Sequence, residues 1–262
     1  MLVAGCALLG LLIGWLVPGL IGRLPERQPD AGDAELGTVG PGERPAPAVP
    51  YAAGPATGAS PLRREPTYAE IARWPLLRPV LAALTAAVFG MLAAARGATA
   101  DLPAFLALGA TGVVLGTVDV RRHRLPDVVT GPALVVGALL LAGAAALGGA
   151  DGTWSAYGRA WAGAFTLGAV YAALHLLRPA DLGFGDVKLA VLLGLHLGWL
   201  GWGVLVAGGF LGFVVGGLVG VGLLLTRRAT LRSAVPFGPS MLVGALLAVL
   251  WGQPLVDAYL GR

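Results

Sequence analysis

Charged residues and cysteine are both scarce in this chain of 262 residues. Lysine, arginine, aspartate and glutamate together make up 12% of the chain, whereas soluble proteins carry about 25%. Hydrophobic residues make up 56% and the mean hydropathy is +0.79, so the composition excludes a soluble globular protein and indicates a chain that lies in a lipid bilayer. The single cysteine, Cys6, excludes an internal disulfide and a cysteine-rich zinc site.

The basic residues are 17 arginines and one lysine, and the formal net charge is +4. They occur in short clusters between apolar segments rather than along one continuous basic stretch. Clusters of this kind set the orientation of membrane helices, whereas nucleic-acid binding requires an extended basic surface. We therefore predict no nucleic-acid partner.

Eight apolar segments approach the length that a bilayer requires. A hydrocarbon core about 30 Å thick is crossed by about 20 helical residues. The sixth segment is the shortest. We therefore predict an all-α integral membrane protein with about eight transmembrane helices. The segments are Leu2–Ile21, Leu77–Ala95, Leu102–Val118, Val128–Leu147, Ala156–Leu177, Val187–Leu200, Gly203–Leu225 and Pro236–Trp251.

The basic residues lie mostly on one side of the predicted membrane. If the N-terminus is outside, 15 of the 18 fall in inner loops, and only Arg96, Arg159 and Arg262 fall outside. Loops rich in arginine and lysine stay in the cytoplasm. No basic stretch precedes the first apolar segment, so we interpret it as a retained anchor rather than a cleaved secretory signal. The prediction is a multi-pass protein of the inner (cytoplasmic) membrane with both termini outside.

The composition changes abruptly between Pro25 and about Pro61, where proline, glycine, alanine and scattered charges replace the apolar residues. Such a stretch cannot bury enough apolar surface to offset the entropy lost on ordering. We therefore predict three parts: a first transmembrane anchor over residues 1–21, a largely disordered cytoplasmic loop over residues 22–76, and a membrane-embedded core over residues 77–262.

Two aspartates, Asp119 and Asp186, are predicted at the inner ends of the third and sixth apolar segments. Two carboxylates brought together in a partly dry site cannot both ionise easily, so one keeps a proton while the other can act as a base. Aspartic proteases use such a pair to activate water and polarise the scissile carbonyl. Gly183 and Gly185 precede Asp186, and residues without a Cβ allow unusual torsions and the close approach of a substrate backbone.

Other interpretations of these residues remain open. Either aspartate alone can be an interfacial charge that balances neighbouring arginines, and Lys188 is interpreted as a cation that reaches from its helix to the membrane surface. A small proton- or ion-coupled transporter would also place acids in the membrane. The acids lie at one face, however, and no pair of broken-helix repeats is visible. A structural assembly factor without an active site is disfavoured because both aspartates are present.

Three motifs resemble those of one known family. They are "VDVRRHRLPD" at Val118–Asp127, "GFGDVKLA" at Gly183–Ala190 and "AVPFGPSMLVGALLA" at Ala234–Ala248. In this order, at inner helix ends, they resemble the type IV prepilin peptidases, the bacterial leader peptidases among the membrane-embedded GxGD aspartic proteases. The likeness covers about Leu102 to Trp251, and "GLIGRLPER" at Gly19–Arg27 is weakly similar to the segment after the family's first span.

The resemblance implies a function for the aspartates. Asp119 and Asp186 would be the catalytic pair, and Asp127 would support them, together with Gly183, Gly185 and Lys188. The substrate would be a prepilin or pseudopilin with a short basic leader followed by an apolar helix, cut at the inner membrane surface. The sequence identifies neither the individual substrate nor the oligomeric state.

The chain departs from the family in its first inner loop. Many relatives carry a metal-binding cysteine tetrad there, and methylate the new N-terminus with S-adenosylmethionine. This loop contains no cysteine, so a cysteine-tetrad zinc site is excluded and we predict no metal. The missing cysteines argue against methylation but do not disprove it. We therefore predict that peptidase activity needs no cofactor.

Overall fold

The computed structural model describes residues 1–25, 67–122, 125–148, 151–178, 182–227 and 236–261. Its regular elements are all α-helices, and no strand occurs among these residues. Seven of the helices found there are long and apolar enough to cross a bilayer, which confirms the all-α integral membrane fold. The helices are α1 (Leu2–Ile21), α3 (Tyr68–Ala72), α4 (Leu77–Arg96), α5 (Leu102–Arg122), α6 (Asp127–Gly148), α7 (Asp151–Leu177), α8 (Phe184–Leu200), α9 (Trp202–Leu225) and α10 (Gly238–Leu260).

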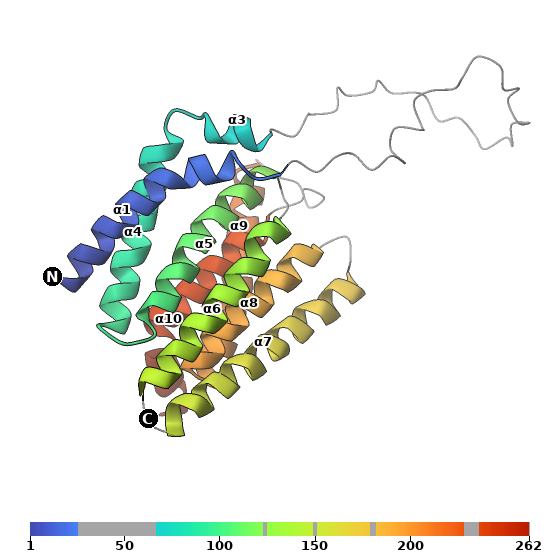
Figure 1. Ribbon diagram of the computed structural model, residues 1–262. Helices are drawn as coiled ribbons and strands as arrows, with labels where there is room; N and C mark the ends of the chain where they lie inside the picture. Colours follow the sequence, from blue (N-terminus) through green and yellow to red (C-terminus); the bar gives the residue numbers. More distant parts are fainter. Residues whose placement is uncertain (26–66, 123–124, 149–150, 179–181, 228–235, 262) are drawn as a thin grey trace, which may run out of the picture.

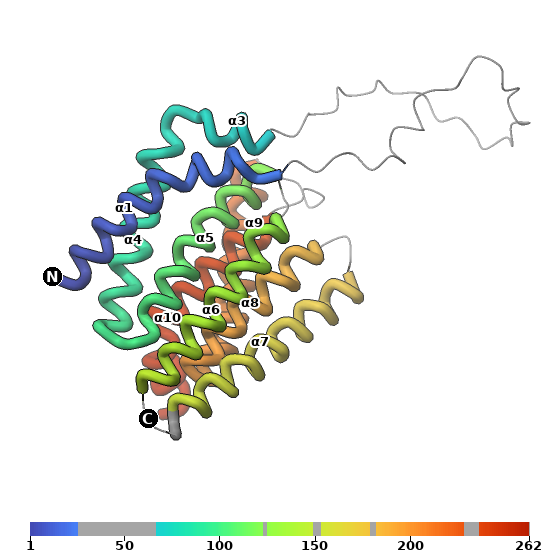
Figure 2. The backbone as a smooth tube through the Cα atoms, viewed as in Figure 1, coloured from blue at the N-terminus to red at the C-terminus, as the bar shows by residue number. Residues whose placement is uncertain are grey.

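The eight long helices run alternately up and down one bundle (Figures 1 and 2). The short helix α3 lies across one end, which we call the α3 end of the bundle. The last turn of α5 and the first turns of α6, α8 and α10 all lie at the α3 end, whereas α1 begins and α10 finishes at the opposite end. Helix ends that are far apart in sequence therefore meet at the α3 end.

Helix α8 corresponds to the sixth predicted segment and has 17 residues, too few to count among the candidate spans. At 1.5 Å per residue it is about 25 Å long. Every residue from Leu192 to Trp199 is buried. A helix that is apolar all round lies inside a bundle rather than against solvent or lipid on one face. All eight predicted segments thus form helices, and seven of them reach the length of a span.

Glycines bring neighbouring helices close together. A Cβ added at Gly194 of α8 would lie 2.5 Å from the carbonyl oxygen of Gly163 in α7, and one added at Gly244 of α10 would lie 2.3 Å from the nitrogen of Gly212 in α9. Real side chains do not come this close to a backbone, so only glycine permits these separations. Close helix packing thus accounts for these glycines, which let α7 pack against α8 and α10 pack against α9.

Polar contacts anchor α8 at the end of the bundle opposite to α3. The indole nitrogen of Trp199 donates to Asp101, whose side chain is buried and also pairs with Arg96. The guanidinium of Arg159 donates to the carbonyl oxygens of Gly198 and Trp199, at 2.9 and 2.8 Å. The last carbonyls of a helix have no partner within it, so these donors complete their hydrogen bonding. The anchor sets how far α8 extends toward the α3 end.

Several boundaries differ from the predictions. Helix α7 begins at Asp151 rather than Ala156, α8 begins at Phe184 rather than Val187, and α10 runs from Gly238 to Leu260 rather than from Pro236 to Trp251. Helix α5 continues past Val118 to Arg122, so Asp119 lies within the helix rather than after it. Helix α3 lies inside the predicted loop of residues 22–76 and is started by a capping box, in which Thr67 and Glu70 bond to each other's backbone nitrogen at 3.2 and 2.7 Å. Most of that loop, residues 26–66, lies outside the described part of the chain.

Candidate active site

The acidic residues singled out in the sequence meet at the α3 end of the bundle. Asp119 lies in the last turn of α5, Asp127 is the first residue of α6, and Asp186 is the third residue of α8. Asp119 and Asp186 are buried, with 4% and 9% of their surface exposed. Buried carboxylates need polar partners, because an unpaired charge in an apolar surrounding is costly.

Asp119 is held by the start of α10. Its Oδ2 atom accepts a hydrogen bond from the backbone N–H of Gly238, at 3.1 Å. Gly238 is the first residue of α10, and the N–H groups of a first helical turn have no partner inside the helix. A Cβ added at Gly238 would lie 2.7 Å from Oδ2 of Asp119. Only glycine at this position therefore lets the carboxylate reach the backbone of α10.

Asp186 is held by the turn that precedes α8. Its Oδ2 atom accepts a hydrogen bond from the N–H of Gly183, at 3.1 Å. Gly183 has an ordinary extended conformation, and neither Gly183 nor Gly185 has a positive φ, so the predicted unusual torsions are wrong. Close approach is found instead at Gly185, where an added Cβ would lie 3.0 Å from the Cβ of Leu125. Gly185 therefore lets α8 pack against the segment that precedes α6.

The carboxylates of Asp119 and Asp186 are near enough for the charge of one to act on the other. The charge of Asp186 also interacts with Tyr171 and His175, which lie one turn apart on α7. The structure thus brings together the two aspartates that the sequence paired, although 67 positions separate them. Such a pair can share a proton and exchange it with a substrate.

The surroundings of Asp186 include two residues to which the sequence analysis gave no role. The Nδ1 atom of His175 lies 2.6 Å from the carbonyl oxygen of Leu182, directly before Gly183, so His175 holds the turn that carries Asp186. Tyr171 is buried and packs on Phe237, which immediately precedes Gly238, with 6.2 Å between ring centres. The contact of Tyr171 with Phe237 has no local sequence signal, because it joins segments that are far apart along the chain. That of His175 spans only seven residues, but it depends on how the connection between α7 and α8 folds.

Comparison with known proteins identifies the family of the region that holds this site. Residues 106–225 match the model of the type IV leader peptidase family, a range that contains both buried aspartates. This region of the chain belongs to the type IV leader peptidase family. The resemblance noted in the three motifs is thereby confirmed.

Curated relatives of this leader peptidase family carry the name "Prepilin leader peptidase/N-methyltransferase". The one from Aeromonas hydrophila is 36% identical over 190 residues, which are 72% of this chain and 62% of the relative. Those from Pseudomonas putida and Pseudomonas aeruginosa are 32% and 29% identical, over 64% and 70% of this chain and 57% and 61% of the relatives. The chain thus spans about 60% of the length of these relatives. No solved structure matches it.

The leader peptidase resemblance also drew attention to Asp127 and Lys188, which form an ion pair. The Nζ atom of Lys188 lies 2.6 Å from Oδ1 of Asp127, and 36% and 67% of the two side chains are exposed. The pair joins the starts of α6 and α8 beside a cavity of about 260 Å³. Lys188 also lies over the ring of Phe184, at 4.9 Å from its centre. An exposed ion pair contributes little to stability, so its main effect is to connect α6 with the first turns of α8, two residues after Asp186.

Metal-binding groups of three or more His, Cys, Asp or Glu side chains do not occur among the residues that the structure describes. The comparisons give no support to the transporter alternative, because the curated relatives named above are peptidases.

Proposed function

We propose that this protein is a membrane-embedded aspartic endopeptidase that removes the short basic leader from prepilins or pseudopilins. One observation carries the proposal: two buried carboxylates, Asp119 and Asp186, interact at one end of a membrane helix bundle of the leader peptidase family. The relatives' name supplies the substrate class. Asp119 and Asp186 are the catalytic residues in this proposal.

The proposed reaction uses one water and one shared proton. The ionised carboxylate takes a proton from water while the water oxygen attacks the scissile carbonyl carbon, and the protonated carboxyl gives its proton to the carbonyl oxygen. The tetrahedral intermediate then collapses. The carboxylate that had acted as acid takes back a proton from one hydroxyl group as the C=O bond re-forms, the C–N bond breaks, and the leaving amine takes a proton from the carboxyl group that had acted as base. The N–H groups of Gly238 and Gly183 keep both carboxylates in place during these transfers. The proposed reaction requires no metal or cofactor.

Asp127, Gly183, Gly185 and Lys188 have supporting roles in this proposal. Gly183 supplies an N–H to Asp186, and Gly185 lets α8 pack against the segment before α6. The Asp127–Lys188 ion pair links α6 to α8 next to Asp186. None of these contacts requires the supporting residue to exchange a proton with the substrate.

Replacing Lys188 with methionine or Asp127 with asparagine is expected to reduce the cleavage rate by less than about tenfold. The reason is that an ion pair this exposed contributes about 0–1 kcal/mol, and each replacement keeps the shape of the side chain. The rates are measured with a prepilin substrate in membranes that contain equal amounts of each variant. A loss as complete as that of an Asp119→Asn variant would show that the pair takes part in the chemistry.

We further propose that the α3 end faces the cytoplasm in the inner membrane, because seven of the nine arginines in the described part of the chain lie near helix ends on that side, and only Arg96 and Arg159 lie toward the opposite end. A cysteine introduced at Arg122, in a Cys6→Ser background, should be labelled from the cytoplasmic side only. A cysteine introduced at Tyr259, which lies at the opposite end and is 90% exposed, should be labelled from outside. Labelling of position 122 from outside would overturn both the orientation and the placement of the active site.

Within the loop over residues 22–76, the segment between Gln28 and Ser60 is proposed to be dispensable for cleavage when the flanking arginines are kept, and the core over residues 77–262 is proposed to carry the peptidase. Deleting most of the segment between Gln28 and Ser60 should leave cleavage largely intact. The mature substrate should carry an unmethylated N-terminus, because a loop without cysteine has no evident means of holding S-adenosylmethionine. Mass spectrometry of the mature N-terminus measures both outcomes.

Two results would contradict these expectations. Addition of one methyl group that depends on this protein and on S-adenosylmethionine would show that the methyltransferase survives without cysteines. Loss of cleavage by a shortened protein that still inserts would show that the loop binds substrate.

The proposed function is tested by mixing membranes that contain this protein with a candidate prepilin. The expected result is a loss of mass equal to that of the leader, absent when both aspartates are replaced. Proton or solute uptake into vesicles, without cleavage of any prepilin tested, would favour the transporter instead.

A further inference from the structure

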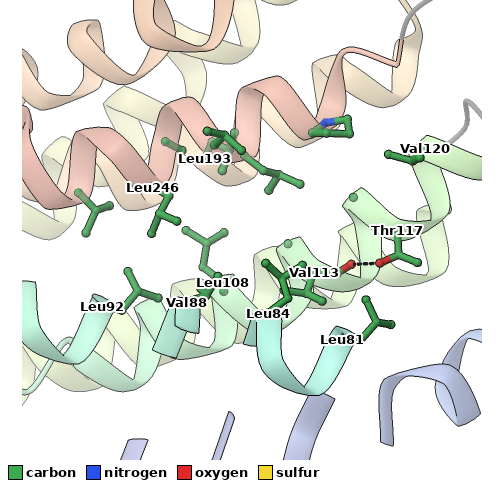
Figure 3. Close-up of a pocket in the computed structure, with 18 of the residues that line it drawn as sticks. Leu81, Leu84, Val88, Leu92, Leu108, Val113, Thr117, Val120, Leu193 and Leu246 are labelled. Atoms are coloured by element: carbon green, nitrogen blue, oxygen red, sulfur yellow. Dashed lines mark hydrogen bonds between the residues drawn. The ribbon is translucent and has the colours of Figure 1, made fainter. Parts of the chain in front are cut away.

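An apolar groove lies between α4, α5 and α10 (Figure 3). It has a volume of about 410 Å³ and extends along α5 from Phe105 to Arg121. Thr117, the one hydroxyl side chain in its lining, bonds to the carbonyl oxygen of Val113 in its own helix, at 2.6 Å. The groove therefore offers an occupant apolar surface along most of its length.

The groove has a buried floor and an exposed rim. Val88 and Leu193 on the floor are 9% and 2% exposed, whereas Leu84 on α4 and Val243 on α10, which line the rim, are 47% and 44% exposed. Both rim helices are candidate membrane spans. The groove thus opens sideways at membrane depth, where its occupant comes from the bilayer.

The groove is long as well as apolar. The stretch of α5 from Phe105 to Arg121 rises about 24 Å along the helix axis. A flexible hydrocarbon chain can lie along this whole length, and its methylene groups match the apolar lining.

The positively charged side chain of Arg121 lies at the end of the groove next to α3. Arg121 contributes to the lining, and its guanidinium stacks on the ring of Trp74 at 3.6 Å. Within the described part of the chain, Arg121 makes no ion pair with a carboxylate. A guanidinium held flat on an indole keeps N–H groups at its edge for an anion, and phosphate suits its geometry. Half-exposed Trp74 is typical of the membrane–water interface, where lipid phosphates lie.

We propose that the groove binds a phospholipid, with one acyl chain between α4 and α10 and the phosphate on Arg121. The bound chain would fill the space beside Pro239, which lines the groove and follows Gly238, the residue that holds Asp119. The lipid would thereby brace the start of α10. This inference depends on membrane insertion and not on the proposed peptidase activity.

The test measures phospholipid binding to the purified, delipidated protein by native mass spectrometry. Dioleoyl phosphatidylglycerol is titrated in detergent, and dioleoylglycerol, which has the same chains without phosphate, is titrated in parallel. Gly116→Leu places a side chain in the groove, and its Cβ would lie 3.5 Å from Leu242, an ordinary contact. Gly143→Leu is the matched control, because nothing lies within 4 Å of a Cβ on that exposed glycine of α6.

The natural protein and Gly143→Leu are expected to bind one phospholipid with the same affinity, and Gly116→Leu to bind it at least about tenfold more weakly. Arg121→Gln should weaken phospholipid binding about tenfold, since a charge-assisted hydrogen bond is lost, and leave dioleoylglycerol binding unchanged. Arg122→Gln is the control for charge, because Arg122 does not line the groove. Leu84→Trp on the exposed rim repeats the test if Gly116→Leu fails to fold, with Leu139→Trp on α6 as its control.

Equal binding by Gly116→Leu and Gly143→Leu, or by Leu84→Trp and Leu139→Trp, would overturn the site. Equal affinity for dioleoylglycerol and phospholipid would overturn the role of Arg121. Displacement of the lipid by the apolar helix of a prepilin, with crosslinks to positions 84 and 243, would show that the groove binds a helix. Each readout is independent of cleavage, so failure of the peptidase proposal leaves this test intact.

Discussion

Replacing either Asp119 or Asp186 with asparagine is expected to abolish prepilin cleavage. An amide has nearly the shape of a carboxyl group and can still accept the hydrogen bonds from Gly238 or Gly183. It cannot take up or release the proton that the reaction transfers. Positioned acid–base groups contribute about 10²–10⁴-fold to rates, so each single variant should lose at least about 10²-fold. The double variant should be little worse than either one, because the two groups act as a unit.

The loss is measured as the initial rate of leader release at equal amounts of inserted protein. Asp257→Asn serves as the matched control. Its carboxylate lies on α10 at the opposite end of the bundle and bonds to Gln253, so its replacement should leave the rate unchanged. Full cleavage by Asp119→Asn or Asp186→Asn would remove that residue from the catalytic pair.

Replacing Gly238 with alanine is expected to produce the second largest loss. The added Cβ would lie 2.7 Å from Oδ2 of Asp119 and 3.3 Å from its Cγ, so either the carboxylate or the start of α10 must move. Both movements weaken the hydrogen bond from the Gly238 N–H to Asp119. A displacement of about 1 Å at a reacting group can cost about 10²-fold in rate. We expect a loss of tenfold to 10²-fold, intermediate between natural protein and Asp119→Asn.

The Gly238→Ala variant should lower kcat far more than it raises KM, because the carboxylate is displaced while the binding surface for the leader remains. Gly217→Ala on α9 is the control, since an added Cβ there meets nothing within 4 Å. A normal kcat for Gly238→Ala, with the protein inserted, would show that the contact with Asp119 does not position it.

The helices were the most predictable part of this protein. Helix α1 has the predicted bounds, α4 is one residue longer at its end, and α6 is one residue longer at each end. Apolar segments bounded by charged residues, glycine or proline are enough to predict these helices. The reason is that nearly every chain segment of this kind that crosses a bilayer is helical. The extension of α5 to Arg122 was missed, since charged residues end an apolar segment without ending the helix.

Helix α3 has a local sequence signal for its start, but that signal alone does not predict a helix. Its Thr67-x-x-Glu70 spacing is that of a capping box, but the five-residue helix that follows is too short to show an apolar period. Helix α8 shows the opposite case. Its 17 residues are short for a span, and only its burial among other helices explains why its length suffices.

The sequence by itself determined the class of the protein and the identity of its candidate residues. Hydropathy along the chain specified the membrane helices, and the spacing of acids relative to these helices selected Asp119 and Asp186. Both inferences need only local information, because burial in lipid depends on the residues of each segment. The tertiary structure decided which backbone groups hold the carboxylates. Gly238 reaches Asp119 across 119 positions of sequence, and α10 meets α5 through side-chain packing that no single segment encodes.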